Sequence, residues 1–324
     1  MENPILTVND LSVGFATGKN IVPAVRNATF ELHKSEILGI VGESGSGKST
    51  LANAVIRLLK GNGAASGEVI YDGTNLLELP EKKMQAIRGR EIGMVFQDPI
   101  QGLDPTMTVG ALLREALHVH RPELRGKELI ETSETILSNV GFAEPKRVLK
   151  NYPFEMSGGM NQRILIAMAL VPSPRILICD EPTTALDVTI QEQIIGLMKR
   201  ERKEHNLSML FITHNFGIAA EICDRLCVMY GGKIVEIGTC RQIFDSPAHP
   251  YTQALLETVP VFGREDREYL PTIPGTPYNA ENMTEGCPFA PRCSCACDAC
   301  RAEFPQKTTL EQDHIVFCNK FSKQ

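Results

Sequence analysis

The amino-acid sequence predicts an α/β fold in which buried strands of a mainly parallel sheet alternate with helices. Short apolar runs have the length of fully buried strands, and they span residues 37–41, 92–96, 176–180 and 209–213. A glycine-rich segment and an apolar-periodic helix directly follow the first run, over residues 42–58. Polar side chains end the other three runs, namely Gln97, Asp180 and His214. Ligands of open α/β sheets bind at such carboxyl ends of strands.

The glycine-rich segment predicts a phosphate site. Residues 42–50, GESGSGKST, fit the pattern G-x-x-x-x-G-K-[ST] in the strand–loop–helix context that the pattern needs. Glycines let successive backbone N–H groups turn inward, and a helix that opens at Lys48 adds its own free N–H groups. A Gly/Ser surface turn is the alternative interpretation. The residues predicted to hold the phosphates are Gly42, Ser44, Gly45, Ser46, Gly47, Lys48, Ser49 and Thr50.

Two further segments flank this core. Residues 4–41 contain short alternating runs that predict antiparallel strands. Phe15 lies in this region, where its ring could stack on an adenine or equally fill the core. Residues 109–149 have a helical pattern, which predicts a helical subdomain inserted over about residues 98–172.

The carboxylates at the end of residues 176–181 indicate catalysis. Asp180 stands where a P-loop enzyme carries a Mg²⁺-binding group. Glu181 could orient or deprotonate a water that attacks the γ-phosphate. An acidic pair in a solvated loop is the alternative, as is a structural role for His214. Because Gln97, Asp180 and His214 stand at the ends of three strands, a functional role is favoured over a structural one.

A second glycine-rich helix start lies at residues 157–170. Ser157 is a suitable N-cap, but a cap explains neither Gly158 nor Gly159, because glycine is unfavourable within regular structure. The pair therefore indicates another close approach of backbone to an anion.

Composition limits the possible classes. The chain has 324 residues, enough for about two domains. Its net charge of −6 argues against a nucleic-acid partner. The longest apolar run, residues 164–171, is too short to span a membrane. The N-terminus lacks a basic and an apolar signal region, so we expect an intracellular chain, held at a membrane only through another subunit.

The C-terminal part has a different composition. Proline-rich segments follow residue 240, which predicts a nucleotide-binding domain over residues 1–240 and a small irregular extension over residues 241–324. Six of the ten cysteines lie between Cys287 and Cys318. In an intracellular protein such clustering indicates metal or redox chemistry. Bonds through these cysteines could stabilise a small domain that has few buried apolar residues.

Six motifs in one order resemble the nucleotide-binding subunits of ABC transporters. They are GESGSGKST (Walker A), Gln97 (Q-loop), MSGGMNQR at residues 156–163 (signature), ILICDE at 176–181 (Walker B), TALD at 184–187 (D-loop, with Asp187) and Thr213–His214 (switch). The resemblance implies a P-loop NTPase with a RecA-like core. It also implies hydrolysis of ATP at a head-to-tail dimer of nucleotide-binding domains.

The resemblance assigns roles to these residues. Glu181 would be the general base, and His214 and Gln97 would sense the γ-phosphate. Mg²⁺ would be held by Ser49, with Asp180 and Gln97 nearby. The signature of one domain would face the ATP of its partner, through Ser157, Gly158, Gly159 and Gln162.

Longer runs are similar to the subfamily that imports dipeptides and oligopeptides, with nickel and glutathione importers as relatives. These runs include residues 22–32, 179–191 and 246–256. The resemblance implies a second homologous ATP-binding subunit, two integral-membrane permeases and an extracellular binding protein. It places the chain at the cytoplasmic face of a prokaryotic cell membrane. A nickel importer or a soluble ABC ATPase without a transport role remains the alternative.

In that subfamily a C-terminal extension binds an iron–sulfur cluster through four cysteines. The matching positions here are Cys287, Cys293, Cys300 and Cys318, with GCPFAPRC supplying the first two. Four thiolates could hold [4Fe–4S] or, alternatively, Zn²⁺. Cys295 and Cys297 fall outside the pattern and are interpreted as free surface thiols, although Cys297 and Cys300 themselves form a C-x-x-C.

Overall fold

The computed structural model describes residues 3–18, 20–98, 102–184, 186–258, 272–279 and 284–322. The chain forms two compact units. The first unit comprises Met1–Leu79 and Phe211–Gln324, and the second comprises Pro80–Leu210. The division at residue 240 that the sequence indicates stays a prediction. Residues 99–101 of the expected helical subdomain, and residues 259–271, 280–283 and 323–324 of the expected extension, lie outside the described residues.

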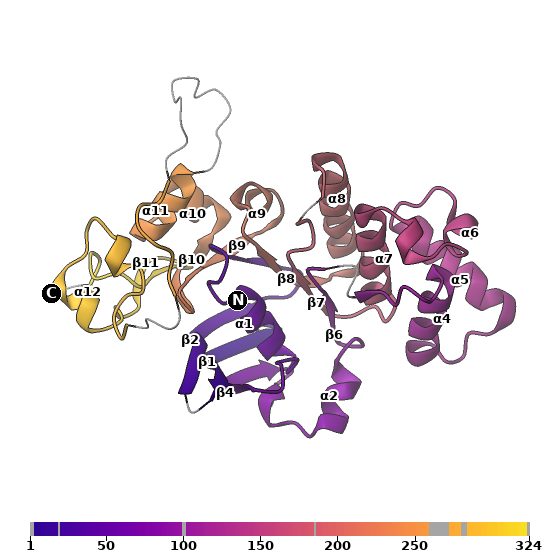
Figure 1. Cartoon of the computed structure of the whole chain (residues 1–324), viewed down its shortest axis with the longest axis horizontal. Helices are drawn as coiled ribbons and strands as arrows, with labels where there is room; N and C mark the ends of the chain where they lie inside the picture. The colour runs from indigo at the N-terminus through magenta and orange to yellow at the C-terminus, as the bar shows by residue number, and fades with distance from the viewer. Residues whose placement is uncertain are drawn as a thin grey trace. The chain divides into compact units, whose positions relative to one another are not determined.

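An antiparallel sheet forms one part of the first unit (Figure 1). Its strands are β1 (Leu6–Thr17), β2 (Asn20–Leu32), β4 (Gly63–Tyr71) and β5 (Thr74–Asn75), in the order β2-β1-β4-β5. The short helix η1 (Leu76–Glu78) follows β5. Alternate residues of β1 such as Leu6 and Val8 are buried, because one face of the sheet packs on the core. The antiparallel N-terminal strands predicted from the sequence are confirmed.

A second sheet of the first unit carries the phosphate loop. Strand β3 (Ile37–Val41) pairs in parallel with β9 (Arg225–Tyr230), and β9 pairs antiparallel with β10 (Lys233–Thr239). Strand β8 (Ser208–Thr213) is the other neighbour of β3. All residues of β3 are buried, as expected of a parallel strand covered on both faces. Helix α1 (Lys48–Val55) starts after the loop, and α9 (Phe216–Ile222) follows β8.

The C-terminal residues extend this same sheet. Strand β12 (His314–Val316) pairs antiparallel with β10, and β11 (Thr308–Glu311) pairs with β12. The described helices of this region are α10 (Cys240–Asp245), α11 (Pro250–Glu257), η4 (Ala290–Arg292) and α12 (Asp298–Ala302). The sequence did not indicate β11 and β12, because strands of three or four residues are too short to show an alternating pattern.

A buried carboxylate fastens the C-terminal residues to β10. Glu236 is fully buried, and its Oε1 accepts a hydrogen bond from the Ala248 N–H (2.7 Å). Its Oε2 accepts one from the His249 N–H (2.9 Å), and His314 Nε2 lies 2.8 Å from Oε1. Because each of these contacts satisfies a buried polar group, the cluster joins the start of α11 and strand β12 to the sheet.

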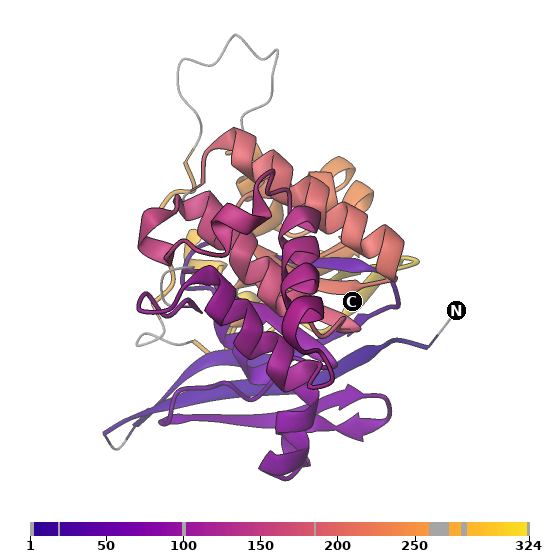
Figure 2. The ribbon, with the colours of Figure 1, turned by 90° about the vertical axis from the view of Figure 1, so that its right-hand side faces the viewer.

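The second unit consists mainly of helices. Its strands β6 (Ile92–Val95) and β7 (Ile176–Asp180) pair in parallel. Its described helices are α2 (Glu81–Ile87), α4 (Val109–His120), α5 (Gly126–Asn139), α6 (Pro145–Val148), η2 (Pro153–Glu155), α7 (Gly158–Leu170) and α8 (Val188–His205). Helices α4 to α8 gather on the right of Figure 1, the side that Figure 2 turns toward the viewer, whereas α2 lies apart from them.

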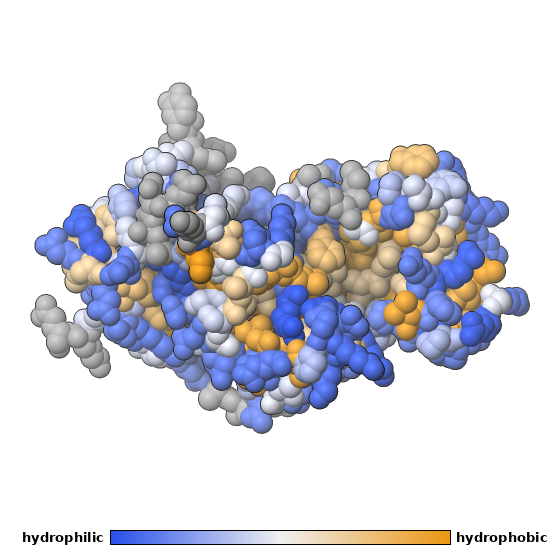
Figure 3. All heavy atoms as spheres, turned by 60° about the horizontal axis from the view of Figure 1, so that its bottom comes forward, coloured by the Kyte–Doolittle hydropathy of each residue, from blue (hydrophilic) through white to orange (hydrophobic). Residues whose placement is uncertain are grey.

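Hydrophilic and hydrophobic residues are interspersed on the face shown in Figure 3. Within the described ranges, every helix is too short or too polar to cross a bilayer.

Candidate nucleotide-binding and catalytic site

The phosphate loop joins β3 to α1, and two of its glycines are required by their surroundings. A Cβ on Gly42 would lie 2.1 Å from the backbone oxygen of Met229. Gly47 has a φ of +101°, and a Cβ there would lie 2.4 Å from the backbone oxygen of Ala24. Side chains at these positions would therefore displace backbone, so the close packing of the loop on its own unit requires glycine.

Lys48 is folded over this loop. The side chain is buried, and its Nζ donates hydrogen bonds to the backbone oxygens of Gly42 and Glu43 (2.9 Å each). The loop thus holds its cation in place before any phosphate arrives. The other predicted phosphate-binding residues lie in the same turn: Ser46 is buried, Ser49 and Thr50 are half-buried, and Ser44 and Gly45 are exposed.

Two other predicted residues belong to the first unit. Phe15 is half-buried in β1, and its Cε1 would lie 2.8 Å from a Cβ on Gly63. Its ring thus packs against neighbouring backbone, and stacking on adenine stays a prediction. His214 is exposed and directly follows the buried Thr213 at the end of β8. Asn215, the next residue, caps α9.

In the second unit the pairing of β6 with β7 gathers the predicted polar residues. Val95 is paired with Cys179, so the residues that follow both strands emerge at one edge. Gln97 Nε2 donates a hydrogen bond to Glu181 Oε2 (3.0 Å). Asp180 ends β7 and is buried. The structure therefore brings together Gln97 and the acidic pair, which are far apart in the sequence.

Glu181 has an unusual backbone and a buried side chain. Its φ is +47°, in the left-handed region that non-glycine residues rarely adopt, and it is only 8% exposed. Besides Gln97, the hydroxyl of Thr184 donates to its Oε2 (2.9 Å). Strained residues persist where the surroundings hold them, and they concentrate at functional sites. The sequence analysis did not identify Thr184 as a partner of Glu181. Only its position three residues after Glu181 could have indicated this contact.

The signature segment begins α7. Ser157 is the N-cap, since its hydroxyl accepts from the Met160 N–H (3.3 Å). A Cβ on Gly159 would lie 2.5 Å from Ile190 of α8, so packing within this unit requires that glycine. Gly158 is exposed, and the nearest atom to its Cβ would be 3.9 Å away. Packing against the described residues therefore does not account for Gly158.

Two further predicted residues lie in α7 and α8. Gln162 is buried in α7, and its Nε2 has no hydrogen-bond partner among the described residues. Asp187 is exposed and is the N-cap of α8, where its Oδ1 accepts from the Ile190 N–H (2.9 Å). Capping accounts for Asp187 locally, and a role at the ATP of a partner stays a prediction.

The four predicted cluster ligands line one small cavity of about 190 Å³ in the first unit, together with Cys295 and Cys297. Cys287 and Cys318 are buried, whereas Cys293 and Cys300 are partly buried. The backbone is closely packed here: a Cβ on Gly286 would lie 2.3 Å from the Cys300 oxygen, and the Cys287 N–H donates to that oxygen (2.8 Å). The cavity therefore gathers thiols from the stretch 287–300 and from Cys318, which lies further along the chain.

The thiols around this cavity differ in their surroundings. Within the described part of the chain, no three Cys, His, Asp or Glu side chains converge closely enough to hold an ion. Burial raises the pKa of Cys287 to about 12. Hydrogen bonds from Cys300 lower the pKa of the exposed Cys297, whose Sγ lies 3.4 Å from that of Cys300.

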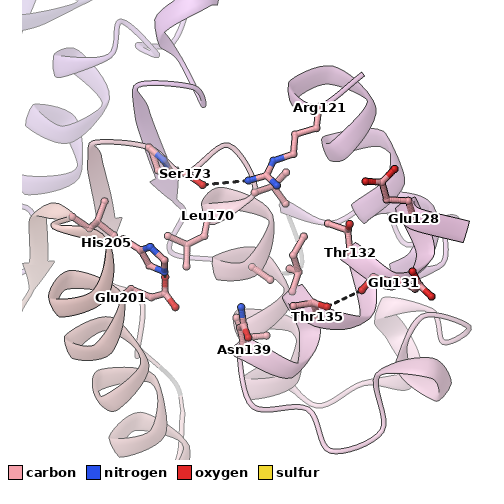
Figure 4. Close-up of a pocket in the computed structure, with 16 residues that line it drawn as sticks. Arg121, Glu128, Glu131, Thr132, Thr135, Asn139, Leu170, Ser173, Glu201 and His205 are labelled. Carbon is pink, nitrogen blue, oxygen red and sulfur yellow. Dashed lines mark hydrogen bonds and ion pairs between the residues drawn. The ribbon is translucent and has the colours of Figure 1, made fainter. Parts of the chain in front are cut away.

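A separate cavity of about 520 Å³ lies in the second unit (Figure 4). Apolar residues of α7 such as Leu170 form part of its lining, and Arg121 contacts Ser173 at its edge (3.5 Å). Burial raises the pKa of Glu201, which also lines it. The predicted site residues do not line this cavity.

The fold and the phosphate loop define a P-loop nucleotide-binding protein, and comparisons with known proteins specify its family. Residues 25–184 match the family described as "ABC transporter". Residues 235–300 match "Oligopeptide/dipeptide transporter, C-terminal region".

Relatives match along nearly the whole chain. The oligopeptide transport ATP-binding protein OppD of Salmonella typhimurium is 46% identical over 92% of this chain and 88% of its own length. The dipeptide transport ATP-binding protein DppD of Bacillus subtilis is 44% identical over 97% of this chain and 94% of its own. The solved dimer of MJ0796, a bacterial ABC transporter cassette, superposes with a TM-score of 0.66 at 28% identity, covering 73% of this chain and 99% of that one.

This chain belongs to the ATP-binding subunits of ABC transporters, in the group of oligopeptide and dipeptide transport ATP-binding proteins. The ABC ATPase fold and the ATPase activity expected from the motifs are confirmed. The roles of individual site residues and the cluster stay predictions.

Proposed function

We propose that this chain hydrolyses ATP to energise an importer of dipeptides or oligopeptides. The observation that carries the hydrolytic part is the geometry of Glu181, whose buried carboxylate is held by Gln97 and Thr184 on a left-handed backbone. The peptide cargo is supported by the names of the relatives and by the C-terminal family match over residues 235–300.

The proposed chemistry is attack of water on the γ-phosphate. Glu181 acts as the general base, since it is a fixed acceptor at the end of a buried strand. Gln97 contacts that carboxylate. Together with His214, it responds to the γ-phosphate and the attacking water. Phe15 stacks on the adenine ring.

The proposed ATP site is shared between two chains. The phosphate loop of one chain holds the triphosphate, while Ser157, Gly158, Gly159 and Gln162 of its partner cover it from the other side. Gly158 supports this arrangement, because it is exposed and its own unit does not require a glycine there. A side chain at that position would keep the backbone N–H groups of the α7 N-terminus away from a phosphate.

Mg²⁺ suits the donors that the chain offers. The Ser49 hydroxyl, the Asp180 carboxylate and the Gln97 amide all present oxygen atoms, the ligands that this ion prefers. Held by such oxygen ligands, Mg²⁺ would neutralise charge on the phosphates.

The proposed partners are a second homologous ATP-binding subunit, two integral-membrane permeases and an extracellular binding protein. The chain would sit against the permeases at the cytoplasmic face of the membrane. Peptide uptake tests the cargo. Cells whose peptide importer lacks only this subunit should regain uptake of a labelled tripeptide when the chain is supplied. Uptake of nickel but not of peptide would contradict the cargo, and failure to co-purify with any membrane protein would favour a soluble ATPase.

We also propose that Cys287, Cys293, Cys300 and Cys318 bind a [4Fe–4S] cluster. The donor set fits, because the four thiols line one cavity and thiolates are the usual ligands of such clusters. Zn²⁺ is the alternative ion that the same four thiolates could hold. Bound there, the cluster would cross-link the segments of the extension that carry its four ligands.

Metal content checks this assignment. The protein purified without oxygen should contain iron and acid-labile sulfide in equal amounts. Cys318→Ser should lose both, because it removes a buried ligand, whereas the exposed Cys295→Ser should retain them. Comparing Cys297→Ser with Cys300→Ser decides between these neighbours. Stoichiometric zinc without iron would overturn the cluster.

A further inference from the structure

The phosphate loop contains an acidic residue, Glu43, at its second position. A carboxylate so close to a triphosphate site opposes the binding of a polyanion unless its charge is balanced. The roles proposed above leave Glu43 without a function. Its side chain and its backbone are both held by residues from the C-terminal part of the first unit.

Arg292 balances the charge of Glu43. Arg292 Nη1 lies 2.8 Å from Glu43 Oε2, and the Arg292 side chain is 5% exposed against 25% for that of Glu43. The Glu43 N–H donates to the hydroxyl of Tyr251 (2.8 Å). The Glu43 backbone oxygen accepts from Lys48 Nζ (2.9 Å). Residue 43 is therefore fixed through its carboxylate, its N–H and its carbonyl at once.

The guanidinium of Arg292 is itself rigidly placed. Its Nη1 also donates to the Tyr230 hydroxyl (3.0 Å). Its Nε and Nη2 donate to the backbone oxygens of Pro274 (2.9 Å) and Ile273 (3.1 Å). The Arg292 guanidinium carbon lies 5.8 Å from the centre of the Tyr230 ring.

The aromatic residues around this pair form one packed group. Tyr251 is fully buried, and its ring centre lies 4.5 Å from that of Tyr230 and 5.2 Å from that of Phe289. Phe289 and Arg292 both lie in the segment between Cys287 and Cys293. The C-terminal extension thus reaches the phosphate loop through a buried, rigid contact.

We propose that Arg292 is a positioning residue for ATP binding, which neutralises the Glu43 carboxylate and, with Tyr251, holds the phosphate loop ready for the triphosphate. This inference rests on the proposed ATPase function. Without Arg292 the Glu43 carboxylate is uncompensated and repels the phosphates of ATP. Without both charges the repulsion disappears.

Binding and kinetics of the purified chain test this proposal. The variants are Arg292→Gln, Glu43→Gln and the double variant, with Arg301→Gln as a control in the same extension, where the arginine side chain is 63% exposed. Titration with a fluorescent ATP analogue should show that Arg292→Gln raises Kd about tenfold. Its KM for ATP should rise by a similar factor while kcat falls less than about twofold, because the group acts on binding.

The double variant shows whether Arg292 affects the Kd for ATP by neutralising the Glu43 carboxylate. Glu43→Gln alone should lower Kd, since it removes a repulsive charge, and the double variant should return to within about threefold of the unchanged protein. A double variant as weak as Arg292→Gln would overturn the proposal, as would Arg292→Gln with normal affinity. Arg301→Gln should bind ATP as the unchanged protein does.

Folding and function are separated by two further measurements. If thermal unfolding shows that Arg292→Gln is misfolded, Arg292→Lys keeps the charge without the planar hydrogen bonds and should raise Kd by less than tenfold. A rise in Kd of tenfold or more in a folded Arg292→Lys protein would contradict the role of charge balance. Failure of the unchanged protein to bind ATP at all would instead refute the proposed ATPase function.

Discussion

Replacing Glu181 by glutamine should reduce the kcat of ATP hydrolysis by about 10²- to 10⁴-fold while leaving ATP binding within a few-fold of normal. An amide cannot accept the proton of the attacking water. It has nearly the same shape as the carboxylate, and its oxygen can still accept from Thr184, which now lies 2.9 Å from Glu181 Oε2. Phosphate release measured at saturating ATP, beside a nucleotide-binding titration, separates the two quantities.

The control for this variant is Glu204→Gln, which makes the same chemical change at an exposed position of α8. It should hydrolyse ATP at the normal rate. Near-normal turnover in Glu181→Gln would remove Glu181 from the role of general base. The left-handed backbone at residue 181 would then need another explanation.

Replacing Lys48 by alanine should weaken ATP binding by about 10- to 100-fold, because charge-assisted hydrogen bonds contribute about 1.5–3 kcal/mol each. The change also removes the donors to the Gly42 and Glu43 carbonyls, so the loop loses its internal support. Equilibrium titration with an ATP analogue measures the effect. Hydrolysis at low ATP should fall at least as far.

The matched control is Lys60→Ala, an exposed lysine a few residues beyond the end of α1. It should bind ATP normally. If Lys48→Ala kept its affinity within about threefold, the loop would not be the phosphate site. A thermal unfolding curve should accompany the titration, since Lys48 is buried and its loss leaves a void.

Local sequence patterns were sufficient for the strands and loops of the core. Residues 37–41 form β3 and residues 176–180 form β7, because short continuous apolar runs of this kind are typical of fully buried strands. The helix start at Lys48 followed equally from the glycine-rich loop before it. Strands β11 and β12 could not be predicted, since their few residues are ordered by pairing with β10.

Local sequence patterns predicted only part of the candidate site. Gln97, Asp180 and Glu181 were identified from their places at strand ends, and the structure brings them to one edge of the β6–β7 pair. The strained φ of Glu181 and the hydrogen bond from Thr184 were not foreseeable. A backbone angle imposed by the surroundings leaves no trace in residue types.

By itself the sequence determined that this chain binds a nucleotide phosphate and belongs to an α/β fold, because the phosphate loop is a local structure encoded by consecutive residues. Only the tertiary structure decided what surrounds that loop. The pairing of Glu43 with Arg292 joins residues 249 positions apart. Such a contact depends on how the C-terminal segments fold back on the core, which no local pattern specifies.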